Sequence, residues 1–178
     1  MEKTIDKNQT EASAIVKFLA SALADKNHNY EAMQFIFNDG VKTMATDGKR
    51  LHIAYTSSVL NPGYWKVLSN TKSSIKLIQV DSTGFTYPNV ERVIPTNCFI
   101  TLDVPVRDAN RMLYEIVLEI KAPINFHYIE ALQMDTYVID SWKLSHSNTI
   151  TDAIKLEALT KKTAVLLHAI IKPMQLGK

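Results

Sequence analysis

Residues 44–51 read MATDGKRL, and this stretch decides how the first half of the chain folds. Its Asp47-Gly48 pair is a hairpin signal, because glycine adopts positive φ without steric cost. On either side, residues 41–45 and 51–55 have the β-rich, alternating pattern of paired strands. The stretch therefore predicts a β-hairpin.

The rest of the chain predicts two helices among antiparallel strands. Residues 11–26 place Ile15, Phe18 and Leu19 at the spacing of one helical face. A shorter helix is expected over 126–134, capped by Asn125, with Phe126, Ile129 and Leu132 facing inward. Further strands are expected at 33–38, 64–68, 74–80, 98–104, 112–121, 136–140, 153–158 and 164–172, and a loop at 145–152.

A proline-bounded segment divides the chain into two helix-plus-strands units. Residues 87–95 read YPNVERVIP, and a proline near each end makes this segment extended and unsuited to a central strand. We expect a disordered N-terminus at 1–10, then one domain over 11–178, with units at 11–84 and 96–178 joined by a linker at 85–95. A length of 178 residues fits one such domain.

Three segments, taken in order, resemble the bacterial replicative sliding clamp, the beta subunit of DNA polymerase III. They are residues 44–51, residues 87–95 and the segment IIKPMQL at 170–176, and the family's counterparts read roughly ATDGHRL, FPDYRRVLP and MPMRL. The resemblance implies an α+β, DNA-clamp-like fold in which two helix-plus-antiparallel-strands units have a pseudo-two-fold arrangement. The chain has about half the length of such a clamp, so the resemblance implies a reduced, clamp-like protein.

In the clamp family, these three segments line a shallow apolar groove that accepts a short peptide from polymerases and other partners. The resemblance therefore implies a protein partner that carries a short clamp-binding-like peptide. Pliable methionine and rigid proline suit such a surface, and arginine stems add apolar contact with a charged rim. Carried over by position, the groove residues are Thr46, Gly48, Lys49, Arg50, Leu51, Pro88, Arg92, Val93, Ile170, Pro173 and Met174.

Three positions depart from the family's pattern in these segments. Lys49 stands where the family has histidine, and Lys172 and Gln175 stand where it has methionine and arginine. The departures indicate a groove that prefers a different peptide, or none. An architectural role for the Asp47-Gly48 turn, and a solvated strand position for Arg50, remain open alternatives.

Charge predicts at most weak DNA binding. The net charge is +2, and the 20 basic and 18 acidic residues are interspersed. Clamps hold duplex DNA through phosphate contacts from their helices, and this term grows with the number of phosphates neutralised. The candidate contacts are few: Lys17 and Lys26 from the first helix, and Lys66, Lys72 and Lys76 near later strands.

Enzymatic chemistry has little support in the sequence. The five histidines lack metal-ligand spacing, the single Cys98 excludes an internal disulfide, and five scattered glycines provide no phosphate loop. Asp135 and Asp140 could be paired carboxylates, although solvated strand ends are the commoner explanation. We therefore expect no catalysis, no metal and no cofactor. The absence of a long apolar run indicates a cytoplasmic protein without membrane contact.

The sequence thus predicts a non-catalytic, sliding-clamp-like interaction module in DNA replication or repair, with a phage or mobile element as its expected origin. One alternative is a DNA-encircling processivity factor built from several copies of the chain, since one domain cannot enclose a duplex. A second alternative is a small ligand-binding protein or hydrolase in which the clamp-like segments are coincidental.

Overall fold

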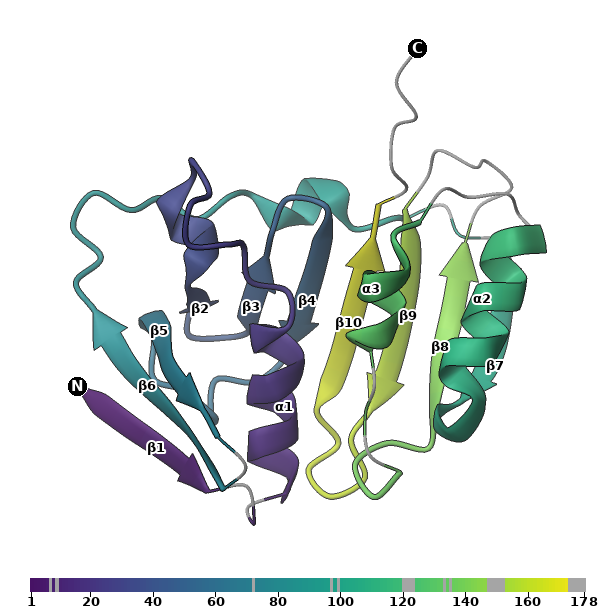
Figure 1. The fold of residues 1–178 in the computed structure, drawn as a ribbon, viewed down its shortest axis with the longest axis horizontal. Coiled ribbons are helices and arrows are strands. Elements are labelled where there is room, and N and C mark those ends of the chain that lie inside the picture. The colour runs from purple at the N-terminus through teal and green to yellow at the C-terminus, as the bar shows by residue number, and fades with distance from the viewer. Residues whose placement is uncertain are drawn as a thin grey trace.

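In the computed structural model, ten strands form one antiparallel sheet, and three α-helices cover one of its faces (Figure 1). The structure describes residues 1–6, 8, 10–71, 73–96, 98, 100–119, 124–132, 134, 136–146 and 153–172, and these counts refer to them. Across the sheet the strand order is β1-β6-β5-β2-β3-β4-β10-β9-β8-β7. The expected α+β class is confirmed.

Most of the expected strands are present, with shifted ends. The helices are α1 Thr10–Ala20, α2 Ala109–Glu119 and α3 Phe126–Glu130, and the 3-10 turns are η1 Glu31–Gln34, η2 Val90–Val93 and η3 Val106–Asp108. The strands are β1 Glu2–Asp6, β2 Ile36–Asn38, β3 Thr43–Thr46, β4 Arg50–Ala54, β5 Gly63–Asn70, β6 Ser74–Val80, β7 Ile100–Pro105, β8 Ser141–His146, β9 Ile154–Leu159 and β10 Leu166–Ile171.

Two halves of the sheet meet at β4 and β10, which pair antiparallel with Leu51 opposite Ile170 and His52 opposite Ala169. Outward from this pair, β3 and β2 on one side correspond to β9 and β8 on the other. Each half also contributes an edge strand that precedes a helix, β1 before α1 and β7 before α2. The β5–β6 hairpin is extra in the first half. This is the pseudo-two-fold arrangement that the sequence predicts.

The main core lies between the sheet and the helices. The face of α1 that the sequence predicts to be apolar is buried, with Ile15, Phe18 and Leu19 each at most 2% exposed. Trp65 of β5 and Trp142 of β8 are fully buried in the same core. Burial of apolar area at this interface is the main favourable term for the fold.

The opposite side of the sheet, here called the outer face, is partly covered by the linker between β6 and β7. Val90 of η2 packs there against Met44, Leu51, Ile53 and Ile170. Strand alternation explains this second cluster, because Leu51 and Ile53 point away from the helices while His52 points toward them. The linker therefore has its own apolar anchor on the sheet.

Part of the N-terminal segment forms a strand, which contradicts at residues 2–6 the expectation of disorder over residues 1–10. Residues 2–6 form the edge strand β1, paired with β6 so that Ile5 lies opposite Ile75. Ile5 is buried in the main core. The free edge of β6 supplies the partner that a short polar segment needs, and this partner lies about seventy residues along the chain.

Three other expectations from the second half were wrong. Residues 112–121 were expected to form a strand, but α2 spans Ala109–Glu119 with Leu113 and Val117 buried one helical turn apart. The strand expected at 136–140 is a turn, and β8 follows it at Ser141–His146, so that its last two residues fall in the loop expected at 145–152. Phe126 was expected to face inward and is 45% exposed, whereas Ile129 and Leu132 are buried.

Candidate functional site: a groove on the outer face

A cavity of about 400 Å³ opens on the outer face, between the β3–β4 hairpin, the linker and the end of β10. Its volume falls in the range of pockets that hold small ligands or peptide side chains. Its walls combine apolar side chains with cations. The lining residues are Met33, Thr46, Gly48, Lys49, Arg50, Leu51, Pro88, Asn89, Val90, Arg92, Val93, Ala153, Ile170 and Lys172.

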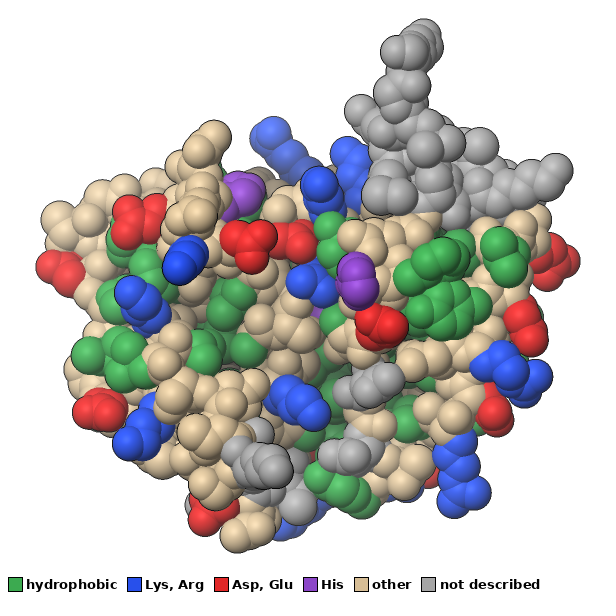
Figure 2. Space-filling view, in the orientation of Figure 1, with side chains coloured by type: hydrophobic (Ala, Val, Ile, Leu, Met, Phe, Trp, Pro, Cys, Tyr) green, Lys and Arg blue, Asp and Glu red, His purple; other side chains and the backbone are tan. Residues whose placement is uncertain are grey.

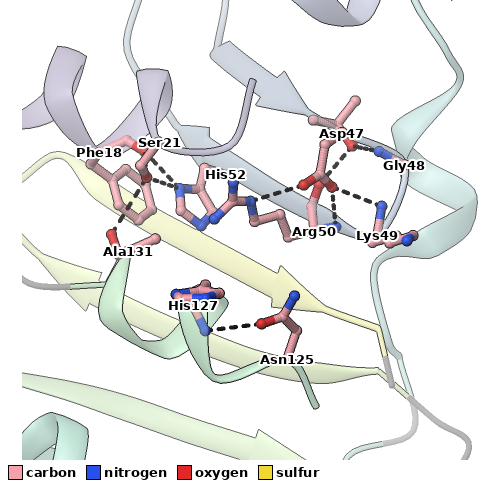
Figure 3. Close-up of polar contacts among 11 residues, drawn as sticks. Phe18, Ser21, Asp47, Gly48, Lys49, Arg50, His52, Asn125, His127 and Ala131 are labelled. Atoms are coloured by element: carbon pink, nitrogen blue, oxygen red, sulfur yellow. Dashed lines mark hydrogen bonds and ion pairs between the residues drawn. The ribbon is translucent and has the colours of Figure 1, made fainter. Parts of the chain in front are cut away.

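The hairpin wall is held by Asp47 (Figure 3). Its Oδ1 accepts hydrogen bonds from the backbone N–H groups of Lys49 and Arg50, each at 2.9 Å, and its Oδ2 lies 3.1 Å from Arg50 Nε. Gly48 has φ +84°, a conformation that favours glycine, and its N–H donates to Thr46 Oγ1 at 3.0 Å. The turn is therefore rigid, with a defined shape toward the cavity.

The linker wall is fixed by burial, capping and an ion pair. Val90 is 7% exposed in the apolar cluster, and Asn89 Oδ1 caps η2 by accepting from the N–H of Glu91. The Glu91 carboxylate pairs with Lys42, next to β3. Tyr87 stacks on Phe37 with ring centroids 4.9 Å apart, and burial raises the pKa of its phenol well above the ordinary value. These contacts hold Pro88, Arg92 and Val93 at the cavity.

The third wall comes from β10, far along the chain. Ile170 lies opposite Leu51, and both belong to the apolar cluster. Beyond the strand, Lys172 N–H donates to the carbonyl of Lys49 at 2.9 Å. This bond joins the end of β10 to the hairpin, so the backbones at Lys49 and Lys172 lie side by side.

The structure brings together most residues that the sequence assigned to the groove. Nine of the eleven line this one cavity: Thr46, Gly48, Lys49, Arg50, Leu51, Pro88, Arg92, Val93 and Ile170. The other two, Pro173 and Met174, lie outside the described residues. Three segments far apart in sequence therefore form one surface.

Arg50 lines the cavity, but its guanidinium lies on the helix side of the sheet. Its Cζ lies 4.6 Å from the ring centroid of Tyr128 on α3, and its Nε bonds Asp47. In Figure 3 the side chain lies on the same side of β4 as His52. Arg50 therefore braces the hairpin against α3.

Five lining residues were not predicted: Met33, Asn89, Val90, Ala153 and Lys172. Lys172 could have been found, because it follows Ile170 by two and adjacent alternate residues share a strand face. Met33 carried no such signal, since the turn η1 brings it there from before β2. Its sulfur lies near Gly48, where an added Cβ would be 3.9 Å away. A pliable methionine thus faces the turn.

The lysines proposed for DNA do not form one surface. Lys17 lies on the helix face, beside a larger cavity of about 570 Å³ that Arg107 and Arg111 also line. Lys66 and Lys76 are exposed on the outer face, because their neighbours Trp65, Ile75 and Leu77 point into the helix-side core. Lys26 is exposed in the turns after α1, and Lys72 lies outside the described residues.

The helix face itself has mixed charge. Figure 2 shows acidic and basic side chains interspersed over it, without one continuous basic surface. At the larger cavity, Arg111 lies 3.7 Å from Asp108 and 3.6 Å from Glu115. Part of the positive charge is therefore already balanced.

His168 has the kind of polar neighbours that a catalytic group would need. His168 lies 2.8 Å from Glu157 and 3.3 Å from the Tyr55 hydroxyl on the outer face, below the groove. Burial lowers the pKa of His168 although Glu157 opposes this, and burial raises the pKa of Tyr55. A hydroxyl with a raised pKa is not an activated nucleophile, so the geometry favours a structural network.

The paired-carboxylate alternative is not supported at its described member. Asp140 forms an ion pair with Lys161 at 2.6 Å, and Asp135 lies outside the described residues. In the described part of the chain, no three His, Cys, Asp or Glu side chains could hold a metal ion. Nor does any helix there have both the length and the apolar character needed to cross a membrane.

Solved structures of bacterial sliding clamps share this fold. The DNA polymerase III beta subunit of Thermotoga maritima superposes with a TM-score of 0.56 at 13% identity, covering 99% of this chain and 66% of its own length. The Pseudomonas aeruginosa clamp superposes with a TM-score of 0.57 at 10% identity, and the match covers 99% of this chain and 67% of the clamp. The C. crescentus clamp superposes with a TM-score of 0.59 at 10% identity, and the match covers 98% of this chain and 65% of the clamp. The chain thus spans about two thirds of the length of these clamps.

Sequence comparison adds no closer relationship: no protein-family model and no curated protein matches the chain. The structural match shows the sliding-clamp fold, as the sequence predicts. Among the solved clamps, one from P. aeruginosa is bound to griselimycin. The C. crescentus clamp holds polyethylene glycol at its proposed β-motif tethering region.

Proposed function

We propose that this protein is a non-catalytic, clamp-like interaction module that docks a short extended peptide of a partner protein in the outer-face groove. The observation that carries the proposal is the convergence of the hairpin, the linker and β10 on one cavity of about 400 Å³. The sliding-clamp fold supports a setting in DNA replication or repair. We also propose a cytoplasmic location and an origin in a phage or mobile element.

The groove has the physical character that peptide docking needs. Val93, Pro88 and Met33 offer apolar surface at the cavity, above the buried Leu51 and Ile170, and burial of such surface drives association. The walls are held by the Asp47 turn and the capped η2, so little ordering cost is left for binding. Small molecules also occupy solved clamps that share this fold.

The direct test is peptide binding to the intact chain and to one groove variant. The probe is a capped, fluorescently labelled peptide with a Leu-Phe core flanked by asparagines. Val93 is 53% exposed, so Val93→Asn leaves the core intact and is expected to weaken binding roughly tenfold. The matched control is Leu68→Asn, because Leu68 is 50% exposed and is no part of the cavity lining.

The result that supports docking is saturable binding that is roughly tenfold weaker in the Val93 variant and unchanged in the Leu68 variant. Equal binding by all three proteins would place the peptide elsewhere. No binding of any flanked peptide, including charged ones, would remove the proposal.

A second candidate function is weak DNA contact by an assembly of several copies. Lys17, Arg107 and Arg111 around the helix-face cavity favour it, as do the two sheet edges β1 and β7. Light scattering tests the assembly, and binding of a short labelled duplex at rising salt tests the contact. A monomer at all concentrations, with no DNA binding at low salt, would exclude this candidate.

A further inference from the structure

Three lysine and arginine side chains line the groove and form no ion pair with any carboxylate in the described part of the chain. They are Lys49 on the hairpin, Lys172 after β10 and Arg92 on the linker. All three are exposed. The cations thus come from all three walls, whereas Arg50, the fourth, is committed to Asp47 and Tyr128.

The positions of these cations concentrate positive charge at the cavity. The Lys172 N–H bonds the Lys49 carbonyl at 2.9 Å, so two lysines sit on adjacent backbone segments. Like charges in such neighbouring positions repel each other, which is a cost for the free protein. None of the described lining residues is acidic. An apolar cavity with a rim of one sign focuses its field on an incoming group of opposite sign.

We infer that the groove selects a peptide whose apolar anchor residues are flanked by aspartate or glutamate. This inference rests on the proposed function and names the partner's chemistry. Carboxylates placed beside the anchor would pair with Lys49, Lys172 and Arg92 while the apolar side chains contact the accessible apolar lining at Met33, Pro88 and Val93. The neighbours Asp47 and Glu91 do not compete, because each is already paired, with Arg50 and Lys42.

The same cations could in principle contact phosphates, but the surface favours a peptide. The cations surround an apolar cavity of about 400 Å³, which a peptide side chain can fill and a duplex backbone cannot. They also lie on the outer face, away from the helices. A duplex would leave Val93 and Ile170 in an unfilled cavity, whereas an anchored acidic peptide covers both the cations and the apolar wall.

The test compares three capped peptides that share a Leu-Phe core and differ in their flanks: aspartate, asparagine or lysine. The aspartate peptide is expected to bind roughly two- to thirtyfold tighter than the asparagine peptide at low salt, from about two exposed ion pairs. The lysine peptide is expected to bind weakest. At about 1 M NaCl the three affinities should converge, because screening removes the charge contribution and leaves the apolar one.

Charge reversal identifies the cations responsible. Lys49→Glu and Lys172→Glu should each abolish the preference for aspartate, since both side chains are exposed and outside the core. The matched controls are Lys66→Glu and Lys76→Glu, exposed on the same outer face and outside the cavity lining. The controls should keep the preference.

The outcomes separate this inference from the proposed function. Equal binding of the aspartate and asparagine peptides, both weakened in Val93→Asn, would overturn the acidic preference and leave docking intact. Preference for aspartate that survives both groove reversals would also overturn it. A third outcome is tight, salt-dependent binding of a short duplex that is lost in both charge-reversal variants, without binding of the aspartate peptide. That outcome would assign the cations to phosphate and would also overturn the acidic preference.

Discussion

His52 is expected to make the folded protein sensitive to mild acid. The side chain is fully buried, its ring stacks on Phe18 at 4.2 Å, and its Nδ1–H donates to the Phe18 carbonyl at 2.6 Å. Burial lowers the pKa of His52 to about 3, the Phe18 carbonyl opposes this, and Arg50 adds to the lowering. The folded state therefore holds His52 neutral, with a proton on Nδ1.

The sign of the effect follows from the two pKa values. In the unfolded chain the pKa is the ordinary 6.5, so below pH 6.5 the unfolded state takes up a proton that the folded state refuses. The contribution of neutral His52 to the free energy of unfolding is complete above pH 6.5 and is lost as pH falls toward about 3. The slope is about 1.4 kcal/mol per pH unit, which gives a loss of about 2 kcal/mol between pH 7.5 and pH 5.0.

Urea unfolding followed by fluorescence measures this loss, because Trp65 and Trp142 are fully buried and report on the core. The variant His52→Gln should be less stable at both pH values, and its loss between them should be smaller by about 2 kcal/mol. Burial also lowers the pKa of His168. The variant His168→Gln therefore measures how much of the pH-dependent loss of stability comes from His168. The lowered pKa of Glu11 acts below its ordinary value of 4.5, outside this window. An unchanged pH dependence in His52→Gln would refute the reasoning.

Two further variants test how the helix and the linker are attached. Glu11 of α1 accepts hydrogen bonds from the Thr160 and Thr163 hydroxyls and from the Lys162 N–H. Glu11→Ala should therefore lower the free energy of unfolding by about 1–3 kcal/mol in urea at neutral pH, and a loss near zero would show that the β9–β10 turn needs no such clamp. Glu91→Gln breaks the ion pair with Lys42 and should change global stability by less than about 1 kcal/mol while it speeds amide hydrogen exchange in residues 85–95. Unchanged exchange there would contradict a role for this ion pair in holding the linker.

The sequence could predict those parts of the fold that short-range chemistry determines. The Asp47-Gly48 turn, the strand Ser74–Val80 and the buried face of α1 each depend on residues close together in sequence. The convergence of the groove segments could be predicted only through the resemblance to clamps. No pattern within residues 44–51 indicates that Ile170 lies beside them.

Other features depended on partners that the local sequence does not show. β1 is a strand because β6 leaves an edge open, not because residues 2–6 have strong β character. In α2, Ala109, Leu113 and Val117 have the four-residue spacing of a helix, but β-branched residues at 116 and 117 favoured a strand. The alternation rule did hold enough information to separate Lys66 from Lys17, since Lys66 adjoins a tryptophan that must face the core.

β4 separates the requirements of stability from those of binding. Its residues Arg50, His52 and Ala54 face the helices and tie the hairpin to α1 and α3. Leu51 and Ile53 face the opposite way and belong to the apolar cluster on the outer face. Contacts on the helix side of the sheet, which a peptide in the groove would not touch, thus hold the shape of the groove. Lys49 and Lys172 lie at the ends of this scaffold, exposed and outside both cores, so their replacement changes the charge of the groove without a large cost to folding. The preference for acidic peptides that we infer can therefore be tested at these two lysines with little effect on folding.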